Sequence, residues 1–336
     1  MKRSYNILIV FVLLFTSLKS QDIHFSQYNQ SPLNLNPSLT GNFNAKYRLV
    51  GNYRNQWNSV GEGYKTYSFS AEGKNLFKIK GVSYGVLLFQ DEAGVGNFTQ
   101  SNYSFSLNYS QNLNYDSTLS VSIGAALSYQ QSKVDFDNFT FDRQYIGTSF
   151  NPNNPNGENF DNDAFGYFNP SVGTHLNYAI NSDNAIKFGV AFHNLIKPKN
   201  SFFQVNDQQQ ETRTTFHFSS TFLLNQLLDI QPSILYMMQG EAQELMIGSN
   251  LRYYFEKTRY AKKAITGGIF YRNQDAAILN LGLEFTHTSF AFSYDIGTSE
   301  LRQASNSKGG LEISIVHLIN NYKPNYKRWT KCPNFM

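Results

Sequence analysis

Apolar and polar residues alternate along most of the chain with a period of two residues. Between residues 119 and 130, Leu, Val, Ile, Ala, Leu and Tyr occupy every second position, and Ser, Gly, Ala and Gln fill the positions between them. This period indicates a β-strand with one apolar face and one small or polar face. Similar segments predict about 14 strands, an even number, near residues 46–55, 65–73, 81–90, 98–110, 117–131, 166–180, 184–194, 211–224, 228–238, 243–256, 262–273, 276–286, 288–297 and 309–318.

The predicted strands and their connections have the lengths found in outer-membrane barrels. Many strands have the roughly 9–11 residues that cross an outer membrane at a tilt, and after the N-terminal apolar run no stretch approaches the roughly 18 apolar residues of a transmembrane helix. Long connections (132–165, 195–210 and 298–308) follow odd-numbered strands, whereas short ones (181–183, 225–227 and 286–288) follow even-numbered strands. Such barrels have long extracellular loops and short periplasmic turns. The sequence therefore predicts an all-β fold, an outer-membrane antiparallel β-barrel of about 14 strands.

The two faces of the predicted strands differ in chemistry. Aromatic residues occur at strand ends on the outward face, as an interfacial girdle requires, at Tyr109, Tyr129, Tyr178, Phe255 and Phe285. The inward face carries small residues and eight charged ones, four of each sign: Arg48, Arg54, Glu72, Arg252, Arg272, Glu284, Asp295 and Glu312. We expect these charges to pair across a filled lumen, in contrast to a pore lined by charges of one sign. The alternative is that some of them lie in solvent beyond the membrane.

Composition excludes other classes. The 336 residues are 41% hydrophobic, 16% aromatic and only 15% charged, with a net charge of +4 and a mean hydropathy of −0.41. Disordered chains have fewer aromatic residues, and helical bundles have more Lys, Glu, Leu and Ala. The single cysteine, Cys332, cannot form a disulfide within the chain.

The N-terminus has the pattern of an export signal. Lys2 and Arg3 precede an apolar run over residues 7–15, which small and polar residues follow. We expect a signal peptide at 1–20, an N-terminal periplasmic or luminal segment at 21–45, the transmembrane barrel at 46–318 and a basic periplasmic tail at 319–336.

Few residues suggest catalysis or metal binding. The six histidines are scattered, and neither a HExxH pattern nor a GxSxG elbow is present. Because Ser–His pairs can assemble in space, a barrel hydrolase stays an alternative, but we expect no enzyme activity and no cofactor. Asp161 and Asp163 are the candidates for a calcium site, and a solvated acidic loop is the simpler interpretation.

The longest loop, 132–165, is the candidate for contact with a partner. It carries more aromatic residues than solvation requires, namely Phe136, Phe139, Phe141, Tyr145 and Phe150.

Several motifs resemble those of the PorP/SprF family of type IX secretion system membrane proteins. The chain has DIHFSQY at 22–28, LNPSLTG at 35–41, YRNQW at 53–57, DEAGVG at 91–96, SYD at 293–295, GLEI at 310–313 and Cys-Pro at 332–333. The family typically has D-P-x-F-S-Q-Y, N-P-A-x-x-G, R-x-Q-W, N-D-x-x-G-x, Y-S-Y-D and S-H-E-I in this order. Ile23 replaces the usual Pro, and Gly310-Leu311 stands where the family often has Ser-His.

The resemblance implies a non-enzymatic accessory barrel in the outer membrane. Such a protein supports export or surface attachment of a secreted protein, such as a gliding adhesin, by binding its C-terminal domain. Its expected partners are that domain, type IX machinery components and outer-membrane lipid, with no nucleic acid. The alternative function is an outer-membrane porin or small-solute transporter.

Overall fold

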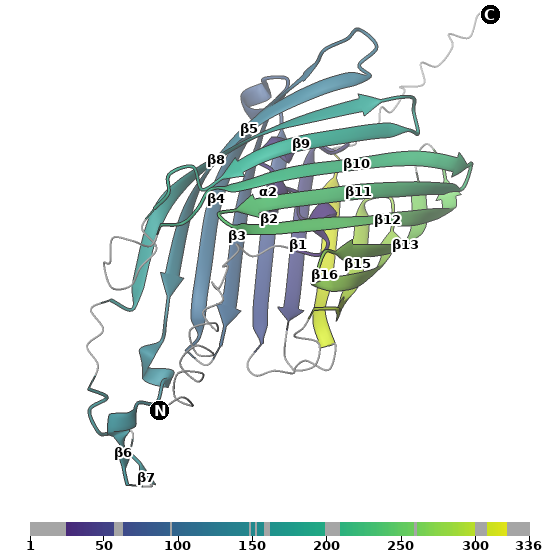
Figure 1. The fold of residues 1–336 in the computed structure, drawn as a ribbon. Helices are drawn as coiled ribbons and strands as arrows, with labels where there is room; N and C mark the ends of the chain where they lie inside the picture. Colours follow the sequence, from purple (N-terminus) through teal and green to yellow (C-terminus); the bar gives the residue numbers. More distant parts are fainter. Residues whose placement is uncertain are drawn as a thin grey trace, which may run out of the picture.

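The chain forms a closed antiparallel β-barrel (Figure 1). The computed structural model describes residues 25–56, 63–94, 96–147, 149–151, 153–157, 162–198, 209–258, 261–299 and 308–320. Within these residues the barrel has 14 strands, each hydrogen-bonded to two neighbours, and β1 pairs with β16 to close it. Closure leaves no unpaired strand edge, as a lipid environment requires. The prediction of an all-β outer-membrane-type barrel of about 14 strands is confirmed.

Every predicted strand is present, with ends that differ by a few residues at most. The barrel strands are β1 (Tyr47–Gln56), β2 (Tyr64–Lys74), β3 (Val82–Ala93), β4 (Phe98–Asn112), β5 (Leu119–Lys133), β8 (Ala164–Ala179), β9 (Ala185–His193), β10 (Arg213–Asn225), β11 (Leu228–Gln239), β12 (Ala242–Lys257), β13 (Lys262–Arg272), β14 (Ala276–Glu284), β15 (Thr288–Gly297) and β16 (Lys308–Ile319). The connections alternate between a long-loop end and a short-turn end of the barrel, as the sequence predicts.

The long connection between β5 and β8 contains elements that the alternation did not predict. They are the 3-10 turns η4 (Phe136–Asn138) and η5 (Asp142–Gln144) and the strands β6 (Tyr145–Ile146) and β7 (Ser149–Phe150). The β6–β7 hairpin lies apart from the barrel (Figure 1).

The outer face of the barrel is apolar and the inner face is polar. On β4, Tyr103, Phe105 and Leu107 face outward and are exposed, whereas Ser106 and Asn108 face inward and are buried. Among the described residues, no helix is both long and apolar enough to cross a bilayer.

We expect a charge on the outer face to destabilise the barrel according to its depth. Phe105 lies four residues from Tyr109 towards the middle of the outward face of β4, and Leu113 lies on the same side just past the end of this strand. Phe105→Arg should lower the free energy of unfolding by about 2–4 kcal/mol, and Leu113→Arg by about 0–1 kcal/mol. Urea unfolding in lipid vesicles measures both, and equal losses would contradict this placement in the membrane.

Residues 25–41, called here the luminal segment, lie inside the barrel. The segment contains η1 (Tyr28–Gln30), α2 (Pro32–Leu35) and η2 (Pro37–Leu39), each a single turn. Proline occupies the first position of α2 and of η2, where its missing N–H and fixed φ are compatible with a helix start. After the luminal segment, the chain reaches the short-turn end of the barrel and enters β1.

The luminal segment covers an apolar patch on the inner wall. Tyr28 and Leu35 pack in one buried cluster with five inward-facing wall residues, namely Leu235, Met237, Met246, Phe270 and Ile278. The rings of Tyr28 and Phe270 meet edge to face with centroids 6.5 Å apart. Burial raises the pKa of Tyr28 to about 12. The wall is therefore apolar where the segment docks, a feature that the prediction of a small and charged inner face omitted.

Candidate functional site

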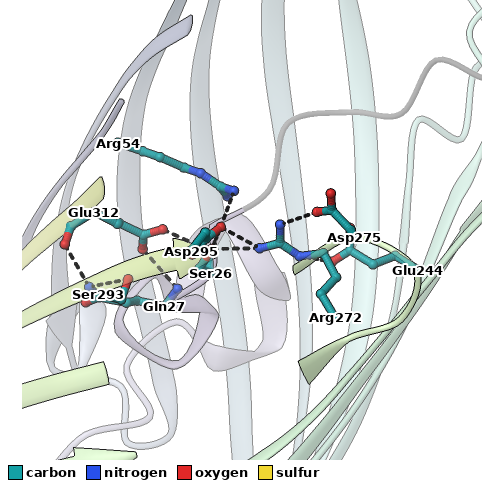
Figure 2. Close-up of polar contacts among 9 residues, drawn as sticks. All are labelled: Ser26, Gln27, Arg54, Glu244, Arg272, Asp275, Ser293, Asp295 and Glu312. Carbon is teal, nitrogen blue, oxygen red and sulfur yellow. Dashed lines mark hydrogen bonds and ion pairs between the residues drawn. The ribbon is translucent and has the colours of Figure 1, made fainter. Parts of the chain in front are cut away.

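A pair of carboxylates on the inner wall holds the start of the luminal segment (Figure 2). The backbone N–H groups of Ser26 and Gln27 donate to the two carboxylate oxygens of Glu312, at 2.8 and 3.0 Å. The Ser26 hydroxyl donates to Asp295 Oδ2 at 2.7 Å. The Gln27 amide donates to Ser293 Oγ and to the carbonyl oxygen of Glu312. These hydrogen bonds attach the start of the segment to the inner wall.

Two arginines balance the charge of these buried acidic residues. Arg54 Nη2 lies 3.1 Å from Asp295 Oδ2, and Arg272 Nη2 lies 3.3 Å from the same oxygen. Arg272 also donates to the Ser26 hydroxyl at 2.6 Å. Arg54, Arg272, Asp295 and Glu312 are each at most 2% exposed. Burial of so many charges is compatible with folding because they are paired and hydrogen-bonded. We call Ser26, Gln27 and these four charged residues the anchor site.

The anchor site unites four sequence motifs from distant parts of the chain. Ser26 and Gln27 belong to the motif at 22–28, and Arg54 to the motif at 53–57. Asp295 and Glu312 come from the motifs at 293–295 and 310–313. Arg54 and Glu312 lie directly opposite each other in the β1–β16 register. Barrel closure therefore assembles the site from the two ends of the chain.

Asn36 holds the middle of the luminal segment. Its Oδ1 accepts from the backbone N–H and from the hydroxyl of Ser38. Asn36 is thereby the N-cap residue of η2. Its Nδ2 lies 3.1 Å from the Thr174 carbonyl oxygen, 3.2 Å from the Val190 carbonyl oxygen and 3.1 Å from His217 Nε2. Asn36 thus joins the segment to three neighbouring strands, β8, β9 and β10.

Glycines on the wall make room for this contact. A Cβ added at Gly173 would lie 2.0 Å from Asn36 Oδ1. At Gly124 it would lie 2.5 Å from backbone atoms of Pro37 and Ser38. Real Cβ atoms do not approach this closely, so the backbones can meet only where the wall has no side chain.

A third carboxylate, that of Glu72, holds the end of the luminal segment. Glu72 Oε2 accepts from the Gly41 N–H at 2.9 Å, and Glu72 Oε1 pairs with Arg48 Nε at 2.7 Å. Arg48 also donates to the Leu39 carbonyl oxygen at 3.3 Å. The segment is therefore fixed to the wall near both of its ends.

All eight charged residues predicted for the lumen lie on the inward face of their strands, and most of them form ion pairs. Besides the pairs already described, Arg252 lies 3.2 Å from Glu284 and 2.7 Å from Asp229. The roles proposed for these residues stay predictions.

Sequence reasoning missed several members of this network. They are Ser26, Gln27, Asn36, Asp229, Asp275 and Glu244, whose Oε1 lies 3.6 Å from Arg272 Nε. Asp229 and Glu244 share the inward phase of their strands, so the alternation could have identified them. Asp275 lies in the turn after β13, 2.7 Å from Arg272, and no periodic signal marks it.

The five aromatic residues of the longest loop form two groups. Phe139 lies between Phe136 and Phe141, with ring centroids 6.3 and 6.4 Å away. Tyr145 and Phe150 face each other across the β6–β7 hairpin at 5.3 Å.

The calcium candidate and the chain ends are only partly described. Asp161 lies outside the described residues, and the carbonyl oxygen of Asp163 accepts from the Val134 N–H. In the described ranges no three His, Cys, Asp or Glu side chains are grouped so that they could hold a metal ion. The expected signal peptide and residues 321–336 of the basic tail also lie outside these ranges.

Two polar cavities adjoin the luminal segment. One of about 360 Å³ lies towards the short turns and is lined by Asn29, Lys187 and Arg252 among others. The other, of about 100 Å³, lies towards the long loops and is lined by Asn34, Gln100 and Arg213 among others.

Several solved barrels are similar to this chain in fold. The Ralstonia pickettii toluene transporter TbuX is 10% identical with a TM-score of 0.48, over 85% of this chain and 92% of that one. A Pseudomonas aeruginosa FadL homologue is 8% identical with a TM-score of 0.47, over 84% and 92%. The P. putida toluene transporter TodX is 9% identical with a TM-score of 0.46, over 85% and 93%. None of the curated proteins matches the chain.

The family comparison covers most of the chain. The model of the family "Type IX secretion system membrane protein PorP/SprF" matches residues 17–317. This span includes the luminal segment, all the anchor-site residues and nearly the whole barrel. The chain therefore belongs to the PorP/SprF family of type IX secretion system membrane proteins.

Proposed function

We propose that the protein is a non-enzymatic accessory barrel of the type IX secretion system in the outer membrane. It supports export or cell-surface attachment of a secreted protein by binding the C-terminal domain of that protein. The observation that carries this proposal is the fixed luminal segment, held by Glu312 near its start and by Glu72 at its end. An occupied lumen suits a docking platform better than it suits a channel for solutes.

The aromatic residues of the long loop are the proposed contact with the secreted domain. Phe139, Tyr145 and Phe150 are 39%, 49% and 40% exposed, and they lie at the end of the barrel that we take to be extracellular. Exposed aromatic side chains often supply most of the binding energy of a protein interface.

Deletion of the gene tests the proposed function. We expect one surface protein of the type IX class to be lost from the cell surface, and the full-length barrel to capture the C-terminal domain of that protein. The double variant Tyr145→Ser/Phe150→Ser should restore barrel levels but capture the domain about tenfold less, as loss of an interface hot spot would. Phe105→Leu, on the lipid face, is the matched control and should capture normally. Normal display of every type IX surface protein in the deletion strain would refute the proposal.

A further inference from the structure

Four apolar side chains at the short-turn end of the barrel are exposed. Phe77 and Ile79 lie between β2 and β3 and are 85% and 54% exposed. Leu113 and Tyr115 lie between β4 and β5; Leu113 is 57% exposed and Tyr115 is fully exposed. Because β3 pairs with β4, the two turns are neighbours on the rim. Adjacent exposed apolar residues usually mark a binding surface.

These side chains lie beyond the lipid that surrounds the strands. Tyr109, at the short-turn end of the apolar outer face, has the place of an interfacial aromatic residue. Leu113 follows four residues later on the same side, and its N–H still pairs with the Leu119 carbonyl oxygen. At about 3.4 Å per residue and a tilt of about 40°, Leu113 is about 10 Å further along the membrane normal. The headgroup layer is only about 5–7 Å thick, so the two turns project into water.

The same part of the rim is positively charged. Lys78 and Lys80 alternate with Phe77 and Ile79 and are exposed. Residues 73–82 include three lysines and no acidic residue, and Asp116 is the one acidic residue between 113 and 118. A surface that is apolar and basic is complementary to one that is apolar and acidic.

We propose that Phe77, Lys78, Ile79, Lys80, Leu113 and Tyr115, together called the lysine–aromatic rim, bind a water-exposed protein surface with apolar and acidic side chains. The inference rests on the proposed function, because it takes the short-turn end as the periplasmic face and the partner as a protein of the secretion machinery. The position beyond the headgroups favours a protein over an anionic lipid surface.

Site-specific photocrosslinking in living cells tests the rim. A benzophenone amino acid replaces Phe77 or Tyr115 in the full-length barrel, and Phe105 on the lipid face carries the same probe as a control. We expect positions 77 and 115 to capture the same protein, through a peptide that contains Asp or Glu beside apolar residues. Position 105 should give lipid adducts. The added substitutions Lys78→Glu and Lys80→Glu should reduce capture about tenfold while barrel levels stay unchanged.

The outcomes separate this inference from the proposed function. Only lipid adducts at positions 77 and 115, no adduct there, or capture that the lysine substitutions leave unchanged would each overturn the rim as a protein-binding surface. Surface display in the deletion strain is scored separately. If deletion abolishes display but the rim captures no acidic partner, the inference fails and the proposed function stands.

Discussion

Replacement of Asp295 by alanine is expected to lower the free energy of unfolding of the barrel by about 3–5 kcal/mol, the usual effect of removing one partner of a buried ion pair. Asp295 accepts from Arg54, Arg272 and the Ser26 hydroxyl, and all these groups are buried. Without the carboxylate, two guanidinium groups lose a shared acceptor where water does not replace it. Equilibrium urea unfolding in lipid vesicles, followed by tryptophan fluorescence and gel mobility, measures the loss.

Asp275 is the matched control because it pairs with the same arginine from an exposed position. Its carboxylate lies 2.7 Å from Arg272 Nη1, but its side chain is 45% exposed. Asp275→Ala should therefore cost only about 0–1 kcal/mol, as exposed ion pairs do. Equal effects of the two substitutions would show that the anchor site has no special role in stability. A second measurement, protease cleavage after residue 25, should increase in Asp295→Ala and stay low in Asp275→Ala.

The barrel could be predicted from the sequence because its physical signal is local. Each strand repeats one choice, apolar outward and small or polar inward, and the period of two survives over ten or more residues. The β6–β7 hairpin escaped prediction because strands of two residues have no period. The pairing of β1 with β16 could be inferred only indirectly, from the even number of strands and because no other segment was predicted to cover the edges of the sheet.

The position of the luminal segment could not be predicted, because its contacts are remote in sequence. Ser26 and Glu312 are 286 residues apart, and the single-turn helices of the segment have no amphipathic period. The inward charges could be identified from strand phase, and some partners follow from register, as with Arg48 opposite Glu72 and Asp229 opposite Arg252. Strand register places Glu312 opposite Arg54. It cannot show that both carboxylate oxygens of Glu312 accept hydrogen bonds from backbone N–H groups of the luminal segment.

The largest functional effect is expected from Gly124→Ala, which should displace the luminal segment and open the barrel to ions. The added Cβ would lie 2.5 Å from backbone atoms of Pro37 and Ser38, which cannot rotate away as a side chain would. The wild-type barrel should be nearly silent in planar bilayers, since the segment occupies the lumen. We expect the variant to conduct on the order of tenfold more, because barrels with more than about 8 strands enclose open space unless it is filled.

Gly267→Ala provides the comparison, since it makes the same change where nothing opposes it. A Cβ at Gly267 meets only the Leu281 side chain, at 4.0 Å. This variant should fold and stay as silent as the wild type. Deletion of residues 25–41 should give still larger conductance if the barrel folds, and Gly124→Ala keeps the test decisive if it does not. Steady, large conductance of the wild type would instead support the porin alternative, because the segment would then leave an open path. A silent Gly124→Ala barrel would contradict the prediction that the segment, held in place at Gly124, is what closes the lumen to ions.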